Sequence, residues 1–474
     1  MAKSVQDILA IIKENDIKMV DFKMVVINGQ YRHVTIPAQN FSEDTMKSGI
    51  GFDASNYGYA VVEKSDMVFI PDPDTAIIDP FCDVPTLSMT GNAMIIDNPQ
   101  NRPLAQYPRN IIRAAVDYMK ASGIADEMLI LPEFEFYLFD EVTWGVDGNY
   151  IGASVDAKQS YWNSDCEGKG VIVQKQKNYH IAKPFDVSYE CRSEMCMHMA
   201  DMGININYHH PEVAASGQFE IEPQLDEVVK MADATMMIKY IIHNTALKHG
   251  KTATFMPKPI YGEAGSGMHV HMLLKKDGQP VFSDDNGYSN LSQTAHYFMG
   301  GLLKHIASLC ALTNPSTNSF KRLVPGFEAP VTVGYATSNR SAVIRIPAYA
   351  KSPDKRRFEL RNPDATCNPY FCYAAILMAG LDGVKNKIDP HENGWGPYDM
   401  NLYHLPEEEK AKLQGLPTSL DEALNALEAD HAYLTETGVF PEELIKNFIK
   451  SKREECRQLA AIPHPAEFDK YYNL

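Results

Sequence analysis

The stretch LPEFEFYLF, residues 131–139, decides how this chain folds, because acidic and aromatic side chains alternate along it. Side chains of a β-strand point alternately to the two faces of the sheet. Glu133 and Glu135 therefore share one face, and Phe134 and Phe136 share the other. A polar face in water would be the ordinary explanation of one such strand. Solvated strands prefer Thr, Lys or Ser, however, so the carboxylates are candidates for a functional site.

Four further segments repeat this alternation: GQFEIE (217–222), GSGMHVHML (265–273), AVIRIP (342–347) and RRFELRNP (356–363). With Glu212, the segments offer five carboxylates and one imidazole as ligands, namely Glu133, Glu135, Glu212, Glu220, Glu359 and His269. If these carboxylates converge, they repel one another strongly unless cations lie among them. Ligand sets rich in oxygen suit Mg²⁺ or Mn²⁺, whereas zinc draws Cys or more His. The pattern predicts a divalent-metal site.

Arginines are concentrated in the same part of the chain: Arg322, Arg340, Arg345, Arg356, Arg357 and Arg361. Surface salt bridges would explain most of them, and for Arg356 that is the better explanation. Beside a carboxylate cluster, the group also fits an anion clamp, since guanidinium groups bind phosphate or carboxylate through paired hydrogen bonds. Divalent metals together with arginines are typical of phosphoryl transfer, in which charge neutralisation and positioning carry most of the catalysis.

Composition excludes several classes of protein. The chain has 44 basic and 61 acidic residues and a net charge of −17, so we expect neither nucleic acid nor an anionic membrane as a partner. No apolar run approaches the roughly 20 residues that cross a bilayer. The N-terminus has charges within it and does not look like a signal peptide. The eight cysteines form no CxxC pair, which favours reduced thiols and a cytoplasmic protein.

The order of the predicted elements favours an α+β fold with a mainly antiparallel sheet. Residues 1–100 are expected to form a small domain that opens with an amphipathic helix and a strand pair around Asn28-Gly29. Residues 101–474 would form a large domain. Residues 140–186 show little periodicity and predict an insertion or long loop. Helical patterns recur at 108–121, 188–202, 226–249, 291–312, 368–387, 419–430 and 441–458.

The same segments resemble glutamine synthetase of the bacterial type I class. The matching motifs, in chain order, are GFDAS (51–55), SDMVFIPDPDTAIIDPF (65–81), PEFEF (132–136), HHPEVAASGQFE (209–220), KTATFMPKPIYGEAGSGMHVH (251–271), NSFKRLVPGFEAP (318–330), NRSAVIRIP (339–347) and RRFELRNPD (356–364). The resemblance implies a β-grasp N-terminal domain and a catalytic domain with a curved sheet surrounded by helices. It also implies a homo-oligomer, a dodecamer of two stacked hexamers with sites shared between neighbours, in which residues 441–474 form a helical tether.

The activity implied by this resemblance is ATP-dependent ligation of ammonia to the γ-carboxylate of glutamate, through γ-glutamyl phosphate. ATP would be a substrate, and two Mg²⁺ or Mn²⁺ ions would act as cofactors. One ion would lie with Glu135, Glu212 and Glu220, and the other with Glu133, His269 and Glu359.

The resemblance also assigns the remaining site residues. Arg340 would face the transferring phosphoryl group, while His271, Arg345 and Arg357 would bind the nucleotide. Gly265, Arg322 and Arg361 would bind glutamate. Asp53 of a neighbouring subunit would take a proton from ammonium, a step that makes physical sense because ammonium cannot attack until it is deprotonated. Its companions in the ammonium pocket would be Ser55, Tyr179, Glu212 and Glu328, the last on a flap that closes over the intermediate.

Some positions depart from the family pattern. Ala54 stands where glycine is usual, Pro211 where histidine is common, and Ala264 where asparagine is usual. These changes leave open an alternative, a glutamate–organic amine ligase of the same superfamily; a third alternative is a non-catalytic relative. Tyr403, in NLYHLPEEE, resembles an adenylylated tyrosine, which would make an adenylyltransferase a further partner. An exposed loop tyrosine explains Tyr403 equally well.

Overall fold

A computed structural model describes residues 3–59, 65–163, 170–400, 408 and 413–474. The chain opens with helix α1 (Val5–Glu14), which begins in a capping box between Ser4 and Asp7. Strands β1 (Met19–Val25) and β2 (Tyr31–Pro37) then form the predicted antiparallel pair, and Gly29 supplies the positive φ of +75° that their turn requires. The expected N-terminal helix and hairpin are both confirmed.

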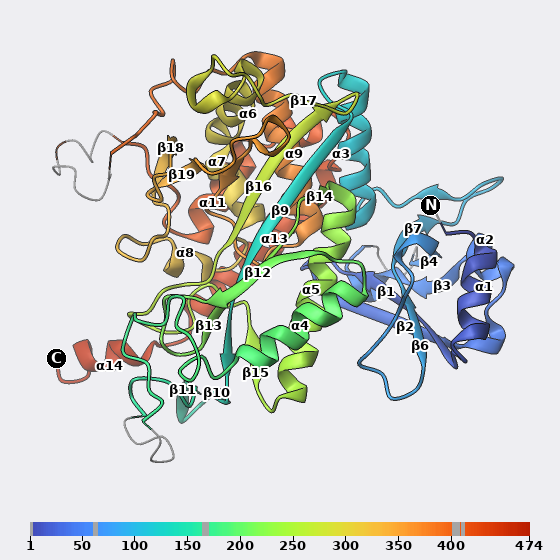
Figure 1. The fold of residues 1–474 in the computed structure, drawn as a ribbon, viewed down its shortest axis with the longest axis horizontal. Helices are drawn as coiled ribbons and strands as arrows, with labels where there is room; N and C mark the ends of the chain where they lie inside the picture. The colour runs from blue at the N-terminus through green and yellow to red at the C-terminus, as the bar shows by residue number, and fades with distance from the viewer. Residues whose placement is uncertain (1–2, 60–64, 164–169, 401–407, 409–412) are drawn as a thin grey trace.

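The small domain contains two four-stranded sheets (Figure 1). The first has the order β2-β1-β6-β5, with β5 at Ile77–Ile78 and β6 at Thr86–Met89. The second has the order β3-β4-β7-β8, with bounds Ile50–Asp53, Asp66–Pro71, Gly91–Ile95 and Arg102–Pro103. Helices α1 and α2 (Glu43–Ser48) pack beside these sheets. Because β8 pairs with β7, the second sheet continues slightly beyond residue 100.

The large domain is built on a ten-stranded sheet whose main path is β12-β13-β9-β16-β20-β19-β18. Neighbours on this path are antiparallel except β18 and β19, which confirms the predicted sheet type. The bounds on this path are β12 Ile206–Pro211, β13 Gln218–Pro223, β9 Glu127–Phe139, β16 Met268–Lys276, β20 Phe358–Leu360, β19 Ala342–Ile346 and β18 Thr332–Thr337. Short strands β14 (Asp226–Glu227), β15 (Thr252–Thr254) and β17 (Gln279–Pro280) pair at its margins.

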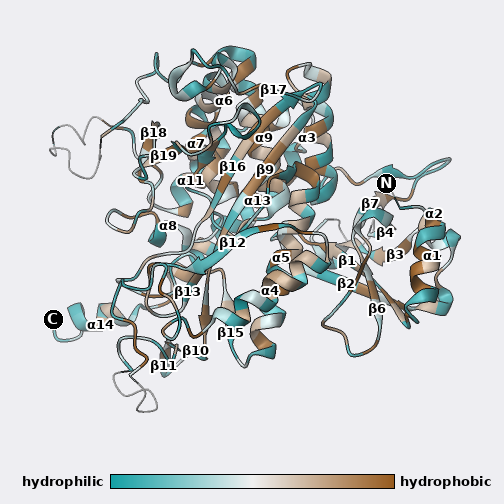
Figure 2. Ribbon diagram, viewed as in Figure 1, coloured by the Kyte–Doolittle hydropathy of each residue, from teal (hydrophilic) through white to brown (hydrophobic). Residues whose placement is uncertain are grey.

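Helices cover the apolar face of this sheet (Figures 1 and 2). They include α3 (Pro108–Ser122), α4 (Tyr189–Asp201), α5 (Val228–Lys248), α6 (Gln293–Lys304), α7 (Ile306–Thr313), α8 (Ser319–Arg322), α9 (Pro369–Asn386), α11 (Leu420–Ala429), α12 (Ala432–Thr435) and α13 (Glu442–Ala460). Helix α14 (Pro465–Tyr471) has no buried residue and lies apart from the sheet near the C-terminus (Figure 1). Phe134, Phe136 and Val270 are fully buried in the core between the sheet and these helices. The opposite sheet face is therefore the one that carries the carboxylates.

Two sequence expectations are wrong in detail. Residues 140–186 are not only loop, because β10 (Glu141–Asp147) and β11 (Tyr150–Asp156) form an antiparallel hairpin. Most residues of this two-stranded ribbon are exposed or half-buried, so it carries no apolar alternation that would reveal its strands. The helix expected over 291–312 is two helices, α6 and α7, which meet at His305. Among the described helices, none is long and apolar enough to span a bilayer.

The junction at His305 is a buried ionic cluster. Its Nδ1 lies 2.8 Å from an oxygen of Asp430, its Nε2 lies 2.9 Å from an oxygen of Asp382, and its ring stacks on Tyr433 at 4.0 Å. Burial alone would lower the pKa of His305, but hydrogen bonds to Asp382 and Asp430 outweigh it and raise the pKa. The carboxylates of Asp382 and Asp430 then accept hydrogen bonds from the protonated ring of His305. These hydrogen bonds join α6 and α7 to α9 and α11.

This cluster predicts a pH-dependent contribution to stability. A raised pKa in the folded state means that the contribution is complete below the unfolded value of about 6.5 and is lost as pH rises through the folded value. His305→Gln should therefore lower the free energy of unfolding by about 1–3 kcal/mol near pH 6, and by less near pH 9. Urea unfolding at both pH values measures the difference, with exposed His391→Gln as the control. A loss that is equal at both pH values would contradict this assignment.

The two domains of one chain meet along α3, α5 and α9. The side-chain amide of Asn368, at the N-terminus of α9, donates to the carbonyls of Val26 and Ile27 at the end of β1. The β1–β2 turn lies so close that a Cβ at Gly29 would come 2.9 Å from the Cα of Asn368. Arg109 of α3 adds a buried ion-pair network to this contact.

Candidate active site

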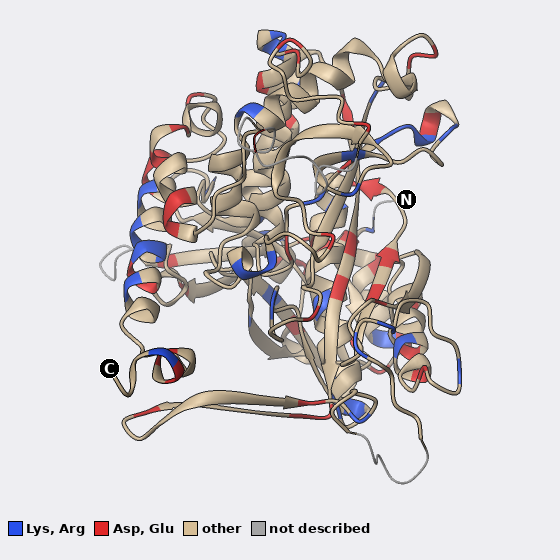
Figure 3. Ribbon diagram, turned by 90° about the vertical axis from the view of Figure 1, so that its left-hand side faces the viewer, with Lys and Arg blue, Asp and Glu red and all other residues tan. Residues whose placement is uncertain are grey.

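Strand register brings the predicted ligands together. In the antiparallel pairs, Glu133 lies opposite His269, Glu135 opposite Glu220, and His271 opposite Glu359. Four neighbouring strands, β13, β9, β16 and β20, therefore present these side chains on one face. Figure 3 shows acidic residues in red on the long strands at the centre of the molecule. Like charges directly opposite one another destabilise a sheet, so this arrangement needs compensating positive charge.

Glu133 is at the centre of the first ligand group. Its Oε2 lies 2.8 Å from Nδ1 of His269, and its Oε1 lies 2.8 Å from Nε2 of His271. Burial opposes ionisation of Glu133, but the two histidines outweigh burial and lower the pKa of Glu133 well below its usual range. Ligand atoms of Glu133, His269 and Glu359 all lie within 4.8 Å of one another. This spacing is compact enough for one cation.

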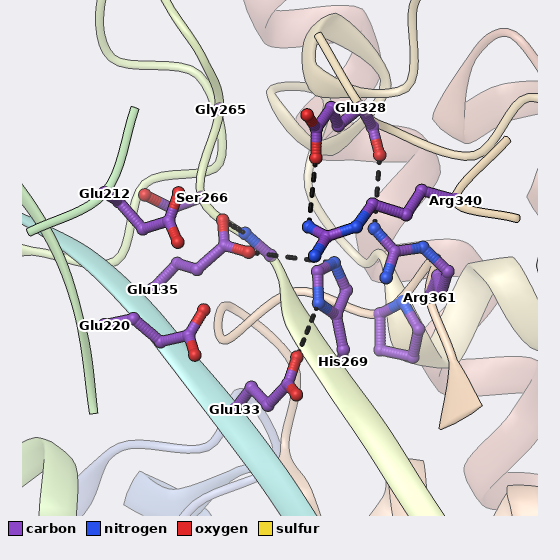
Figure 4. A network of polar contacts seen from close by, with 12 residues as sticks. Glu133, Glu135, Glu212, Glu220, Gly265, Ser266, His269, Glu328, Arg340 and Arg361 are labelled. Atoms are coloured by element: carbon purple, nitrogen blue, oxygen red, sulfur yellow. Dashed lines mark hydrogen bonds and ion pairs between the residues drawn. The ribbon is translucent and has the colours of Figure 1, made fainter. Parts of the chain in front are cut away.

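A second group contains His210, Glu212 and Glu220, whose ligand atoms also lie within 4.8 Å of one another. Burial, reinforced by neighbouring carboxylates, raises the pKa of both Glu212 and Glu220 well above the usual value. Glu135 lies between the two groups, where its Oε2 accepts a hydrogen bond of 2.8 Å from the Gly267 amide. Figure 4 shows Glu133, Glu135, Glu212 and Glu220 directed toward a common space beside His269.

The donor set fits hard divalent cations. Oxygen ligands predominate and imidazole is the other donor type, and among the described residues no cysteine lines the cavity into which the groups open. Mg²⁺ and Mn²⁺ favour such ligands. Burial first and the neighbouring carboxylates second raise the pKa of Glu212 and of Glu220, and a bound cation would oppose both effects. The residues therefore fit a metal centre.

Five of the six predicted arginines line this cavity of about 770 Å³, namely Arg322, Arg340, Arg345, Arg357 and Arg361. Arg345 Nη1 lies 2.7 Å from Glu359, and Arg361 also pairs with Glu359. Burial opposes ionisation of Glu359, but His271 and the two arginines lower its pKa. Arg356 lies outside the cavity and pairs with Asp285, as expected for a salt-bridge residue.

The Gly265-Ser266-Gly267 turn is packed against Arg322. A Cβ at Gly265 would lie 2.4 Å from the Pro257 carbonyl and 2.8 Å from Cγ of Arg322, so only glycine fits. Arg322 Nη1 donates to the Asn362 carbonyl at 2.8 Å, and its Nη2 lies 3.3 Å from Nε2 of His269. The turn thus lets a cationic side chain reach His269 of the first ligand group.

Tyr179 also lines the cavity, and it belongs to a row of rings. Tyr179 stacks on His180 at 4.0 Å, His180 meets His210 at 4.4 Å, and His210 stacks on Tyr208 at 5.7 Å. This aromatic wall, defined here as Tyr179, His180, His210 and Tyr208, borders the second ligand group. Three of its members, Tyr179, Tyr208 and His210, line the cavity.

Asp53 and Ser55 do not join these residues within one chain. They lie in the small domain, where Asp53 ends β3, and neither lines the cavity. The Asp53 carboxylate accepts hydrogen bonds from the amide and hydroxyl of Ser55, at 2.9 and 2.7 Å, which lower its pKa. Tyr403 lies outside the described residues.

Sequence reasoning missed several cavity residues, chiefly His210 and Glu222. Glu222 accepts hydrogen bonds from Tyr208 and from Asn207, the latter at 2.7 Å, and forms a third compact group with Glu133 and Glu220. A signal was present, because Glu222 continues the alternation of Gln218 and Glu220, and His210 precedes Glu212 by the same interval of two.

The fold and the site define a class of protein in which a β-grasp domain precedes a curved antiparallel sheet lined with carboxylates that fit divalent cations and with arginines. Residues 16–95 match the family model described as the glutamine synthetase beta-Grasp domain. Residues 105–471 match the glutamine synthetase catalytic domain. The chain belongs to the glutamine synthetase family.

Similar proteins extend over the whole chain. The chain is 45% identical to "3-hydroxylaminophenol mutase" of Cupriavidus pinatubonensis, covering 100% of both chains. It is 44% identical to "Glutamine synthetase" of Pasteurella multocida, covering 99% of both. Among solved structures, that of Plasmodium falciparum glutamine synthetase is similar at a TM-score of 0.88 and 30% identity, covering 100% of this chain and 99% of the other.

Proposed function

We propose that this protein ligates ammonia to the γ-carboxylate of L-glutamate with ATP, forming L-glutamine, ADP and phosphate through γ-glutamyl phosphate. The observation that carries this proposal is the strand register, which sets Glu133 opposite His269 and Glu135 opposite Glu220 beside the cavity arginines. Phosphoryl transfer depends mainly on neutralising and positioning phosphate charge. This cavity offers both carboxylates for cations and guanidinium groups for anions.

The cation-binding roles follow the two compact groups. Glu133, His269 and Glu359, which form the first group, would hold one Mg²⁺ or Mn²⁺ ion. Glu212 and Glu220 of the second group, together with the neighbouring Glu135, would hold the other. Such ions, when bound, neutralise phosphate oxygens and polarise the reacting groups. His210 is an additional candidate for the second group. The repulsion among the buried carboxylates supports a role in which positive charge is drawn between them.

The arginines would take the anionic substrates. Arg345 and Arg357, with His271, lie beside Glu359 and would bind the nucleotide phosphates. Arg340, which pairs with Glu328, would face the transferring phosphoryl group. Glutamate would lie against Arg322, Arg361 and the Gly265 turn.

Completion of the site would require a second copy of the chain. Asp53 and Ser55 lie in the small domain away from the cavity of their own chain. We propose that they serve a neighbouring subunit, where the Asp53 carboxylate would take a proton from ammonium next to Tyr179, Glu212 and Glu328. The same proposal includes a dodecamer of two stacked hexamers and a cytoplasmic location. It also includes membership of the type I subclass, in which an adenylyltransferase would adenylylate Tyr403.

The direct test measures phosphate release and glutamine formation from glutamate, ATP and Mg²⁺ with and without ammonium. We expect both products to depend on ammonium and to form in equal amounts. Putrescine and ethanolamine, tested in place of ammonium, examine the alternative of an organic-amine ligase. Turnover with either amine comparable to that with ammonium would favour that alternative, and the absence of ammonium dependence would reject the ligase proposal.

A second candidate function is favoured by one relative and by the aromatic wall. The relative that is 45% identical over the full chain is named a 3-hydroxylaminophenol mutase. Three residues of the aromatic wall, Tyr179, Tyr208 and His210, line the cavity and would contact an aromatic compound there. A mutase rearranges one molecule and consumes no ATP. Incubation with 3-hydroxylaminophenol, without ATP or glutamate, therefore separates the two functions by the appearance or absence of an isomer.

A further inference from the structure

The turn at residues 324–329 covers one side of the cavity and has an unfavourable backbone. The unfavourable position is Glu328, which adopts a left-handed conformation with φ of +57°, whereas glycine tolerates the φ of +95° at Gly326. A residue other than glycine pays roughly 1–3 kcal/mol in a sparsely populated backbone region, so surrounding contacts must hold it there. Two such contacts are visible in Figure 4: Arg340 pairs with the Glu328 carboxylate at 3.1 Å, and Arg361 donates to its carbonyl at 3.3 Å.

A third contact reaches this turn from another part of the chain. Nζ of Lys258 lies 3.7 Å from the ring centroid of Phe327, the residue before Glu328. A cation over the face of an aromatic ring is attracted by the ring quadrupole, and more strongly when it is partly desolvated. Both Lys258 and Phe327 are half-buried. The side chain of Lys258 therefore holds the turn. Lys258 is not one of the residues assigned above to cation binding or anion binding.

Hydrogen bonds to Asn318 fix the backbone of Lys258 in place. Its backbone amide donates to Oδ1 of Asn318 at 2.7 Å, and its carbonyl accepts from Nδ2 of the same residue at 3.1 Å. Its Nζ also donates to the carbonyl of Glu263, directly before the Ala264-Gly265 segment of the cavity wall. One ammonium thus joins the glutamate-facing segment to the turn that carries Glu328.

A buried carboxylate accompanies this ammonium. Glu263 is fully buried, and neither of its carboxylate oxygens has a hydrogen-bond partner among the described residues. Lys175 and Lys258 are the cations that interact with it electrostatically. Burial lowers the pKa of Lys258 to about 8, with Glu263 opposing that shift and Arg322 adding to it. Glu263 therefore helps to keep Lys258 charged while it contacts Phe327.

We propose that Lys258 is a positioning residue that holds the 324–329 turn closed over the cavity through Phe327, and that it thereby keeps water from the acyl phosphate. The second half of this statement rests on the proposed ligase function. The first half concerns only the position of the turn and does not depend on the ligase function. Water exclusion by a closing loop is a general requirement for reactions that pass through a hydrolysable intermediate.

The first experiment compares amide hydrogen exchange over residues 324–331 in the wild-type protein and in Lys258→Met. We expect exchange in this segment to be about fivefold faster in the variant, the factor for loss of a partly desolvated cation–π contact. Lys258→Arg keeps a cation over the ring and should resemble the wild type. Lys248→Met is the matched control, because Nζ of Lys248 also lies over a phenylalanine, Phe81, at 4.9 Å but outside the cavity.

Exchange over 324–331 that is unchanged in Lys258→Met, or equally faster in Lys248→Met, would overturn the positioning role. The second readout is the ratio of phosphate released to glutamine formed. We expect about one in the wild type and about two or more in Lys258→Met, because an open turn admits water to the intermediate. Faster exchange with an unchanged ratio would overturn the role in water exclusion. If the wild type forms no glutamine, the ligase proposal fails while the exchange result still decides the role of Lys258.

Discussion

Glu133→Gln is expected to lower the rate of ammonium-dependent phosphate release by ~10³-fold or more. Glu133 is the carboxylate that contacts both His269 and His271 and that also belongs to the group with Glu359. The amide keeps the size of the side chain but removes its negative charge, so a cation held by these residues would lose a ligand, and a bound phosphate would lose part of its counter-charge. Initial-rate assays at saturating glutamate, ATP and Mg²⁺ measure the loss.

Calorimetric titration with Mn²⁺ provides a readout that is independent of turnover. In Glu133→Gln, we expect at least about tenfold weaker binding for one class of sites and unchanged binding for the other, since Glu212 and Glu220 keep their geometry. Glu141→Gln, on the exposed hairpin strand β10, is the matched control and should retain both activity and metal binding. A variant at Glu133 that keeps a tenth of the wild-type rate would contradict the assignment of this residue as a ligand.

Arg109→Met is expected to destabilise the folded chain by roughly 3–5 kcal/mol, because it removes a buried cation from two half-buried carboxylates, Asp72 and Asp233. Arg109 is 4% exposed and binds Asp233 through Nε at 3.0 Å and through Nη2 at 2.9 Å. The same Nη2 lies 2.8 Å from Asp72, and Nη1 donates to Asn92 at 3.1 Å. Since Asp72 and Asn92 belong to the small domain, the substitution should also weaken the interface between the two domains.

Denaturant unfolding measures the loss in free energy of unfolding. Limited proteolysis of residues 96–107 measures whether the interface between the domains is weakened. Arg113→Met is the matched control, since Arg113 is exposed one turn further along α3. It should change the free energy of unfolding by less than about 0.5 kcal/mol. If Arg109→Met changes stability no more than Arg113→Met does, the buried network does not hold the domains together.

Much of the fold could be predicted because local patterns are strong in this chain. The period-two alternation of 131–139 predicted a strand with one buried face, and the register confirms that Phe134 and Phe136 are in the core while Glu133 lies opposite His269. The hairpin β10–β11 could not be found in this way, because a ribbon exposed on both faces carries no apolar period. The break at His305 was missed for a related reason: α6 and α7 are both apolar, so the pattern runs across the junction.

The sequence by itself determined which side chains share a face, because alternation along a strand is a property of the backbone. It also determined the chemical character of the site, since carboxylates, histidines and arginines recur in the segments that line it. Only the tertiary structure decided which of them meet. Register between strands far apart in the chain placed Glu135 opposite Glu220 and brought His210 and Glu222 into the cavity, while Asp53 lies in another domain. Register depends on long-range pairing and packing, which no local pattern contains.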